Sequence, residues 1–148
     1  MGTVGYKEIA EVLGGRKVFG KSVRSVWFWT DLIEEGFPFG ALESLKKILR
    51  LSDREISSAL DVSTKTASRW RHGEKTRLPS SVSDRIFRYA RIFALAEQVL
   101  EDRDAARDWL HDTQIGLGGR SPIDLMRTEA GAREVESLLI RIEHSVLS

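Results

Sequence analysis

Residues 52–73 read SDREISSALDVSTKTASRWRHG, and this stretch decides how the rest of the chain is interpreted. Ser52 can cap a helix that follows it, and Glu55, three residues later, can complete a capping box. Ile56 and Leu60 fall one helical turn apart and form an apolar stripe. The sequence therefore predicts a short amphipathic helix that begins after Ser52 and ends near Leu60.

A second helix is predicted directly after the first. Asp61-Val62-Ser63 interrupts the first helix, and Ser63 is a residue type that caps helix N-termini well. Ala67 and Trp70 lie three residues apart and would face back onto the first helix. Two short helices and a three-residue turn predict a helix-turn-helix. The usual turn has glycine where Asp61 stands, but aspartate tolerates the left-handed conformation better than most residues.

The outward face of the second helix carries small hydroxyls and cations: Thr64, Lys65, Thr66, Ser68, Arg69 and Arg71. Arginine and lysine pair with guanine edges, serine and threonine hydrogen-bond to base edges or phosphates, and the threonine methyl group meets thymine. This chemistry favours insertion into the major groove of DNA. The alternative is a plain helical hairpin whose charges are only solvated.

The bulk composition is that of an ordinary globular protein with one domain, or two small domains that share a core. The 148 residues are 41% hydrophobic and 30% charged. The absence of cysteine excludes a disulfide framework, thiol catalysis and thiolate metal sites. No stretch has the character of a signal peptide or approaches the ~20 apolar residues of a membrane span, so we expect a cytoplasmic protein with no membrane partner.

The net charge of +1 hides an asymmetry along the chain. Residues 1–40 carry five basic and five acidic residues, whereas residues 41–91 carry twelve basic and six acidic residues, a net charge of +6. Residues 92–148 carry six basic and eleven acidic residues, a net charge of −5. The basic block coincides with the helix-turn-helix, where attraction to phosphate requires it. The acidic block would repel DNA and suits solvent or a basic protein partner.

The remaining sequence predicts an all-α fold, because apolar residues recur at helical spacing and no useful strand alternation is present. We divide the chain into an N-terminal helical segment (1–40), a helix-turn-helix region (41–91) and a C-terminal helical region (92–148). Beyond the helix-turn-helix, helices are expected at 6–13, 22–35, 41–51, 82–100 and 104–111, and from a cap at residue 128 to residue 143. A loop or turn is expected at 16–21, and a loop is expected at 116–122.

Two clusters leave alternatives open. Residues 26–29, Val-Trp-Phe-Trp, are interpreted as core, with a self-association surface as the alternative because Trp and Phe are enriched at interface cores. Three rings in such a run cannot all point one way on a helix. Arg85, Arg88 and Arg91 lie three residues apart, and they either contact phosphates or pair with Asp84 and solvent.

Enzyme chemistry is not indicated. His72, His111 and His144 lie far apart in sequence, without the spacing of metal ligands, so neither a metal nor a cofactor is expected. The glycines at 116–119 lack the preceding strand and the spacing of a dinucleotide-binding fingerprint, and no P-loop is present. No nucleophile and base stand in an arrangement that predicts catalysis.

The second half of the chain has a pattern beyond periodicity. It comprises Leu78-Pro79, Ser83-Asp84-Arg85, Trp109-Leu110, Leu117-x-Gly119-x-Ser121-Pro122-x-x-Leu125, Thr128-x-x-Gly131-x-x-x-Val135, Leu138-Leu139 and Arg141-Ile142. This pattern resembles the toxin-binding domain of Xre/MbcA/ParS-type antitoxins. The upstream Leu13-Gly14-Gly15 and Gly36-Phe37-Pro38 also resemble that group, so the resemblance covers almost the whole chain.

The resemblance implies a bacterial type II antitoxin whose partner is a RES-domain toxin encoded in the same operon. Toxins of that kind resemble ADP-ribosyltransferases and degrade NAD. The antitoxin would cover the active site of the toxin with residues 92–148. Through the helix-turn-helix it would bind operator DNA and repress its own operon. A homodimer is implied as well, which matches palindromic operators.

The resemblance also assigns residues to the two surfaces. The implied DNA contacts are Ser63, Thr64, Lys65, Thr66, Ser68 and Arg69. The implied toxin contacts are Leu117, Gly131, Val135, Arg141, Glu143, Val146 and Leu147.

The end of the chain and the overall function each have a rival interpretation. Val146 and Leu147 have no obvious core to join, so they form either a frayed end or a plug for a cleft in the partner. A ligand-responsive transcriptional repressor without a toxin partner would require an apolar pocket. A protein-binding adaptor with a helix-turn-helix that no longer binds DNA is the other rival.

Overall fold

The computed structural model describes residues 4–23, 25–73 and 77–147, without the side chains of residues 146 and 147. The all-α prediction is confirmed, because the described residues contain no strand and only isolated bridges at Pro38–Arg77 and Gln114–Arg120. The helices are α1 (Tyr6–Val12), α2 (Arg16–Phe19), α3 (Val26–Glu35), α4 (Phe39–Leu49), α5 (Asp53–Leu60), α6 (Thr64–Arg71), α7 (Ser80–Leu100), α8 (Arg103–His111), the 3-10 turn η1 (Ile115–Leu117), α9 (Pro122–Leu125) and α10 (Glu129–Leu147).

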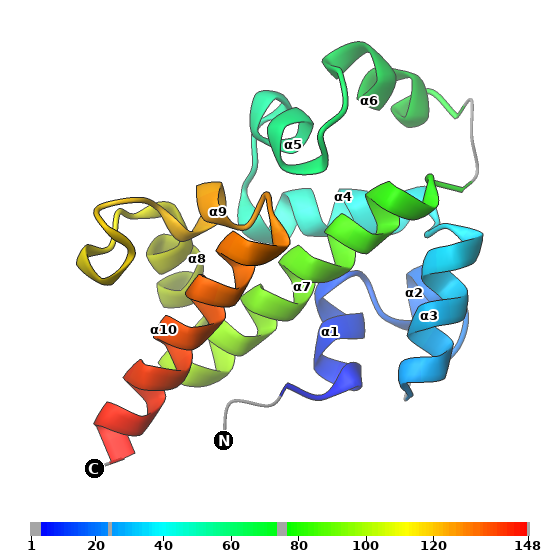
Figure 1. Cartoon of the computed structure of the whole chain (residues 1–148). Helices are drawn as coiled ribbons and strands as arrows, with labels where there is room; N and C mark the ends of the chain where they lie inside the picture. Colours follow the sequence, from blue (N-terminus) through cyan, green and yellow to red (C-terminus); the bar gives the residue numbers. More distant parts are fainter. Residues whose placement is uncertain (1–3, 24, 74–76, 148) are drawn as a thin grey trace.

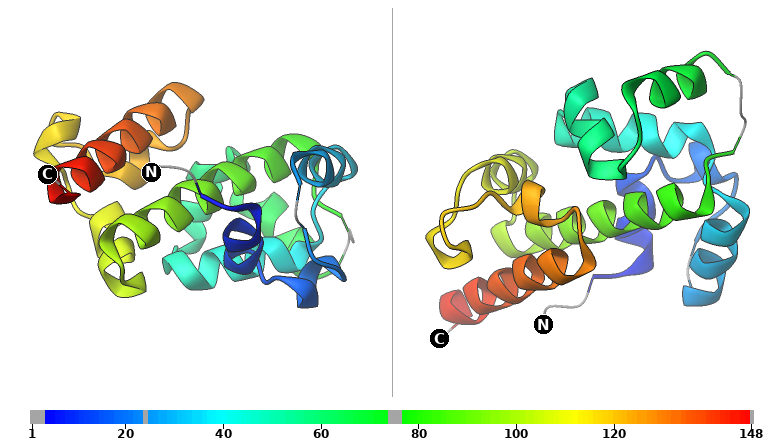
Figure 2. Two further views of the ribbon diagram at one scale, coloured as in Figure 1. Left: turned by 90° about the horizontal axis from the view of Figure 1, so that it is seen from below. Right: turned by 45° about the horizontal axis from the view of Figure 1, so that its top comes forward.

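Helix α7 is the central element of the fold. It packs against α1, α3, α4 and α5 and also against α8 and α10, so elements from both ends of the chain meet on it. Figures 1 and 2 show α7 crossing the molecule, with α5 and α6 beyond α4 and with α10 running beside it. Ile86, Tyr89 and Phe93 are fully buried in this helix. Because α7 spans residues 80–100, the proposed division at 91 and 92 falls within one continuous helix.

The aromatic run at 26–29 is divided between core and surface. Trp29 is buried and contacts Phe19 and Phe37 edge to face, with ring centroids 5.6 and 5.9 Å apart. Trp27 points outward and is 74% exposed. The core interpretation therefore applies to Trp29, and Trp27 has no place in the core.

One expected boundary near the N-terminus was wrong. The helix expected from residue 22 begins at Val26, because Ser25 is the residue that caps it and accepts a hydrogen bond from the Phe28 N–H (3.3 Å). The loop or turn expected at 16–21 contains α2, a single helical turn that brings Phe19 to the aromatic cluster. A single turn is too short to show helical periodicity in the sequence.

Across the described residues, no helix combines the length and the apolar character needed to span a membrane.

Candidate functional site

The helix-turn-helix is built from local hydrogen bonds that the sequence predicted. The Ser52 hydroxyl accepts a hydrogen bond from the Glu55 N–H (3.1 Å), and the Glu55 carboxylate accepts one from the Ser52 N–H (2.9 Å). Asp61 ends α5 in the left-handed conformation, with φ 54° and ψ 49°. The capping box and the tolerance of aspartate in the turn are therefore confirmed.

Helix α6 is fixed by one cap and one buried side. Ser63 accepts a hydrogen bond from the Thr66 N–H (3.0 Å) and donates one to the Thr66 hydroxyl (2.9 Å). Trp70 is buried with Ile56 and Leu60 of α5 in the same core. Burying this side fixes which residues of α6 face solvent.

The opposite side of α6 brings the six candidate DNA contacts onto one surface. Ser63, Thr64, Lys65 and Arg69 are exposed, and Thr66 and Ser68 are half-buried. Figure 1 shows α5 and α6 together at one end of the molecule, with no other helix covering α6. A surface of this shape and polarity can enter a major groove.

Arg71 is exposed as well, but its guanidinium is paired within the helix-turn-helix. Its guanidinium donates to the Asp53 carboxylate (2.8 Å), and the Lys46 ammonium forms an ion pair with the same carboxylate oxygen. The hydrogen bond from Lys46, and then the one from Arg71, hold the pKa of Asp53 below its ordinary value. Arg71 therefore ties α6 back to α5 and α4.

The C-terminal region is organised around the start of α10. The Thr128 hydroxyl accepts a hydrogen bond from the Gly131 N–H (3.0 Å), as its predicted cap requires. Gly131 is packed so closely that an added Cβ would lie 1.9 Å from the Leu125 carbonyl oxygen. Leu117, Gly131 and Val135, three candidate toxin contacts, are buried within this region.

The other candidate toxin contacts lie further along α10. Arg141 is exposed and Glu143 is half-buried. Helix α10 continues to Leu147, beyond the expected end at residue 143. The side chains of Val146 and Leu147 lie outside the described residues. The accessible part of the candidate set is thus the second half of α10.

Both halves of the chain match known family models. Residues 28–91 match the antitoxin Xre-like helix-turn-helix domain, and residues 95–144 match the antitoxin Xre/MbcA/ParS C-terminal toxin-binding domain. An antitoxin Xre of Yersinia enterocolitica is 33% identical over 119 residues, which cover 80% of each chain. This chain belongs to the Xre antitoxin family.

Two further proteins support this membership. An antitoxin Xre of Photorhabdus laumondii is 28% identical over 118 residues, which cover 79% of each chain. In a crystal structure of the Mycobacterium tuberculosis MbcT–MbcA toxin–antitoxin complex, one chain matches with a TM-score of 0.51 and 25% identity. The match covers 68% of this chain and 88% of that one. The protein is therefore an antitoxin of a toxin–antitoxin system, with a helix-turn-helix domain and a C-terminal toxin-binding domain.

Two arginines of the antitoxin connect its regions instead of extending the basic surface. The Arg88 guanidinium donates to the Glu129 carboxylate (3.2 Å) and to the carbonyl oxygens of Met126 (3.3 Å) and Arg127 (3.1 Å). Arg91 forms an ion pair with Glu136 of α10. The structure pairs these two residues with α10 and not with Asp84, and their contact with phosphate stays a prediction. Their partners lie 38 to 45 positions away, and sequence spacing alone does not show which helices meet.

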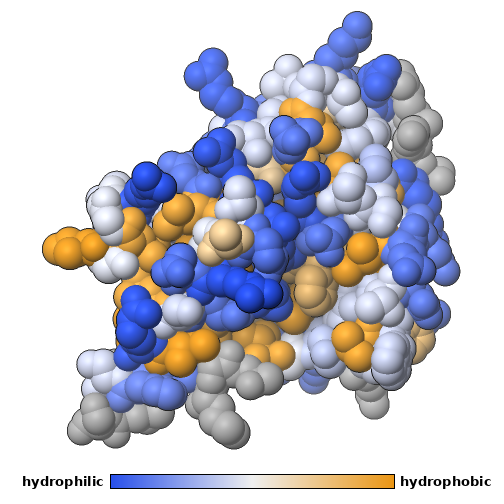
Figure 3. All heavy atoms as spheres, in the orientation of Figure 1, coloured by the Kyte–Doolittle hydropathy of each residue, from blue (hydrophilic) through white to orange (hydrophobic). Residues whose placement is uncertain are grey.

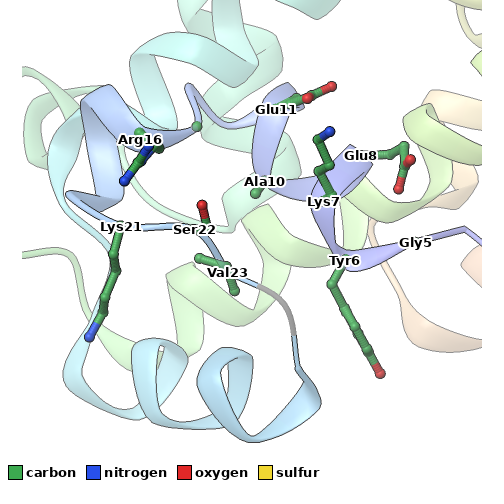
Figure 4. Close-up of a pocket in the computed structure, with 11 residues that line it drawn as sticks. Gly5, Tyr6, Lys7, Glu8, Ala10, Glu11, Arg16, Lys21, Ser22 and Val23 are labelled. Atoms are coloured by element: carbon green, nitrogen blue, oxygen red, sulfur yellow. The ribbon is translucent and has the colours of Figure 1, made fainter.

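A cavity of about 480 Å³ lies at the N-terminal end of the antitoxin, between α1 and the segment that precedes α3. Figure 4 shows Ser22 and Val23 between Lys21 on one side and Tyr6 on the other. The lining of this cavity includes the charged side chains Lys7, Glu8, Glu11, Arg16 and Lys21. The rival interpretation as a ligand-responsive repressor requires an apolar pocket. Tyr6, Ala10 and Val23 also line this cavity and most of its exposed lining is apolar, so the cavity is compatible with that rival.

No group of three or more metal-ligating side chains occurs among the described residues of the antitoxin. His72 lies at the end of α6, where its Nδ1 is 2.8 Å from the Ser68 carbonyl oxygen, and His111 Nε2 is 2.8 Å from the Leu49 carbonyl oxygen. Both imidazoles thus contact helix carbonyls, as expected for capping histidines.

One exposed residue was missed by the sequence interpretation. Ile115 lies in the loop between α8 and α9 and is 98% exposed. The available signal was an isoleucine flanked by Gln114 and Gly116 in a stretch with no helical periodicity. A pattern of that kind marks a loop, but it does not tell whether the apolar side chain turns inward.

Proposed function

We propose that this antitoxin neutralises a RES-domain, NAD-degrading toxin encoded in the same operon by covering its active site with the end of α10. Through α6 it binds operator DNA as a homodimer and represses its own operon in the cytoplasm. The functional division follows the boundaries 1–40, 41–91 and 92–148. The observation that carries the proposal is the presence of both a helix-turn-helix and a toxin-binding domain in one chain.

The arrangement of the two surfaces supports this division of work. Helix α6 and the C-terminal end of α10 lie at different ends of the molecule in Figure 1, so one chain can hold both partners. The basic charge accompanies α6 and the acidic charge accompanies α10. The match to a chain from the MbcT–MbcA complex supports a protein toxin as partner.

The test is the NAD content of cells that express the neighbouring reading frame, with and without this chain. We expect NAD to fall when the neighbour is expressed alone and to be preserved when the antitoxin is co-expressed. An unchanged NAD content with the neighbour alone, or no protection by the antitoxin, would refute the proposed toxin class or the neutralisation.

Operator binding is measured separately as a function of salt. Each phosphate that the protein neutralises should contribute about −0.9 to the slope of log affinity against log salt. A DNA fragment from the operon's own promoter should therefore bind with a steep slope. A flat or absent response would favour the protein-binding adaptor instead.

A further inference from the structure

Ile115 has the greatest exposure of any large hydrophobic residue that the structure describes, 98% of its surface. It occupies the start of η1, at the tip of the loop that joins α8 to α9. Figure 1 shows this loop projecting at the edge of the molecule. A single exposed apolar residue is ordinary on a protein surface, so the surroundings of Ile115 decide whether it has a role.

The loop that carries Ile115 is held by its own hydrogen bonds. The Gln114 N–H donates to the Arg120 carbonyl oxygen (3.0 Å), and the Gly119 N–H donates to the Gln114 carbonyl oxygen (2.9 Å). The Gln114 side-chain amide also donates to the Trp109 carbonyl oxygen (3.0 Å). The tip is therefore ordered by folding, and a partner would not have to order it on binding.

The loop also rests on α10. Leu117 is buried beneath the tip, and a Cβ added at Gly116 would lie 3.0 Å from the Leu138 Cδ1 atom. Leu138 is half-buried, and Arg141 is exposed three residues later on the same side of the helix. Ile115, Leu138 and Arg141 together form what we call the Ile115 surface. Figure 3 shows hydrophobic atoms gathered on the side of the molecule where this loop and α10 lie.

We infer that the Ile115 surface is a second part of the toxin interface, in which Ile115 fills an apolar recess of the toxin and Arg141 faces a carboxylate at its edge. This inference rests on the proposed neutralisation of a toxin. It extends that proposal by adding Ile115, a contact that is not among the motif positions of the family. Large side chains that enter pockets dominate binding energy at protein interfaces.

Two observations, together with the proposed role of α10, assign the Ile115 surface to the toxin as opposed to DNA. Ile115 lies within residues 95–144, which match the toxin-binding domain. The region 92–148 carries a net charge of −5, which disfavours DNA. The surface is continuous with α10, the element proposed to reach the toxin's active site.

The experiment compares the full-length Ile115→Ala variant with the wild-type antitoxin in binding to the purified toxin. We expect the dissociation constant to rise about tenfold or more, since burying one isoleucine side chain contributes on that scale. Ile115→Val should stay close to wild type. Trp27→Ala is the control, because it removes another large exposed apolar side chain that lies outside the toxin-binding domain, and its toxin affinity should be unchanged.

Folding is controlled by thermal melts, in which Ile115→Ala should match the wild type because the side chain is nearly fully exposed. Equal toxin affinity of Ile115→Ala and the wild type would overturn the inference while leaving the proposed neutralisation intact. An equal loss of toxin affinity in Trp27→Ala would also overturn the inference, because it would show that exposed apolar side chains contribute to binding wherever they lie. If the wild-type antitoxin does not bind the toxin at all, the proposed function itself fails and this inference fails with it.

Discussion

The caps of the helix-turn-helix and the hydrogen bonds that attach the C-terminal region to α7 act over very different distances along the chain. In the helix-turn-helix, Ser52 bonds to Glu55 and Ser63 bonds to Thr66, each three residues away. Helix α7 is joined to the C-terminal region over longer distances, because the Tyr89 hydroxyl donates to the Ile123 carbonyl oxygen, 34 positions away, and the Arg88 guanidinium donates to the Glu129 carboxylate, 41 positions away. Local caps leave the outer face of α6 free for a partner, whereas the C-terminal region uses many of its motif positions for its own packing.

The largest effect that tests this contrast is expected from Gly131→Ala. The new Cβ would lie 1.9 Å from the Leu125 carbonyl oxygen, so α9 and α10 would have to separate. We expect a loss of at least about 2 kcal/mol in the free energy of unfolding, measured by urea denaturation. Glu134→Ala, on the exposed side of the same helix, is the control and should change little. A fully stable Gly131→Ala variant that fails to bind toxin would instead place Gly131 at the interface itself.

Arg88→Ala tests whether the long-range connections matter as much as the packing. It would remove the donor shared by the Glu129 carboxylate and two carbonyl oxygens. The Arg88 side chain is only 12% exposed, so we expect a loss of about 1–3 kcal/mol in unfolding free energy. The salt dependence of operator binding should be unchanged. Arg85→Ala, one turn earlier, is the matched control. An equal loss of unfolding free energy in that variant would show that the hydrogen bonds of Arg88 are not what stabilises the fold.

The same contrast explains what could be predicted from the sequence. The caps at Ser52 and Ser63 and the turn at Asp61 depend on neighbouring residues, so spacing along the chain was enough to predict them. The partners of Arg88 depend on how α7 and α10 cross, which no local pattern encodes. The exposure of Ile115 could not be predicted for a related reason, since it depends on how the loop rests on α10.

Substitutions on α6 should separate binding from stability. We expect Lys65→Ala and Arg69→Ala each to weaken operator binding about tenfold, as the loss of a base or phosphate contact does. Toxin binding should stay at the wild-type value in both variants, because both side chains lie on the exposed side of α6, and Lys65→Ala should also keep the wild-type thermal stability. Lys17→Ala, which removes the same charge from the exposed surface of α2, controls for net charge. Loss of toxin binding in both α6 variants would contradict the division into two surfaces.

The smallest effect is expected from Asp53→Asn, which tests whether charge adds to the caps of the helix-turn-helix. Hydrogen bonds from Lys46 and Arg71 lower the folded-state pKa of Asp53, so the carboxylate stabilises the fold when ionised. This contribution is fully present above the ordinary aspartate pKa of about 3.9 and is lost as the pH falls through the lower folded-state pKa. The melting temperature of Asp53→Asn should therefore lie slightly below that of the wild type at pH 7.

The difference between the two proteins should shrink below about pH 3.9 and also with added salt, because the three side chains meet at the surface. Equal melting temperatures at pH 7 would mean that the caps and the apolar stripe alone hold α5 and α6 together. A difference that persists in acid would mean that the asparagine disturbs the first turn of α5 by a route other than charge. Either result would sharpen the comparison with Arg88 and Arg91, whose carboxylate partners on α10 lie 41 and 45 positions away, whereas the partners of Asp53 lie 7 and 18 positions away.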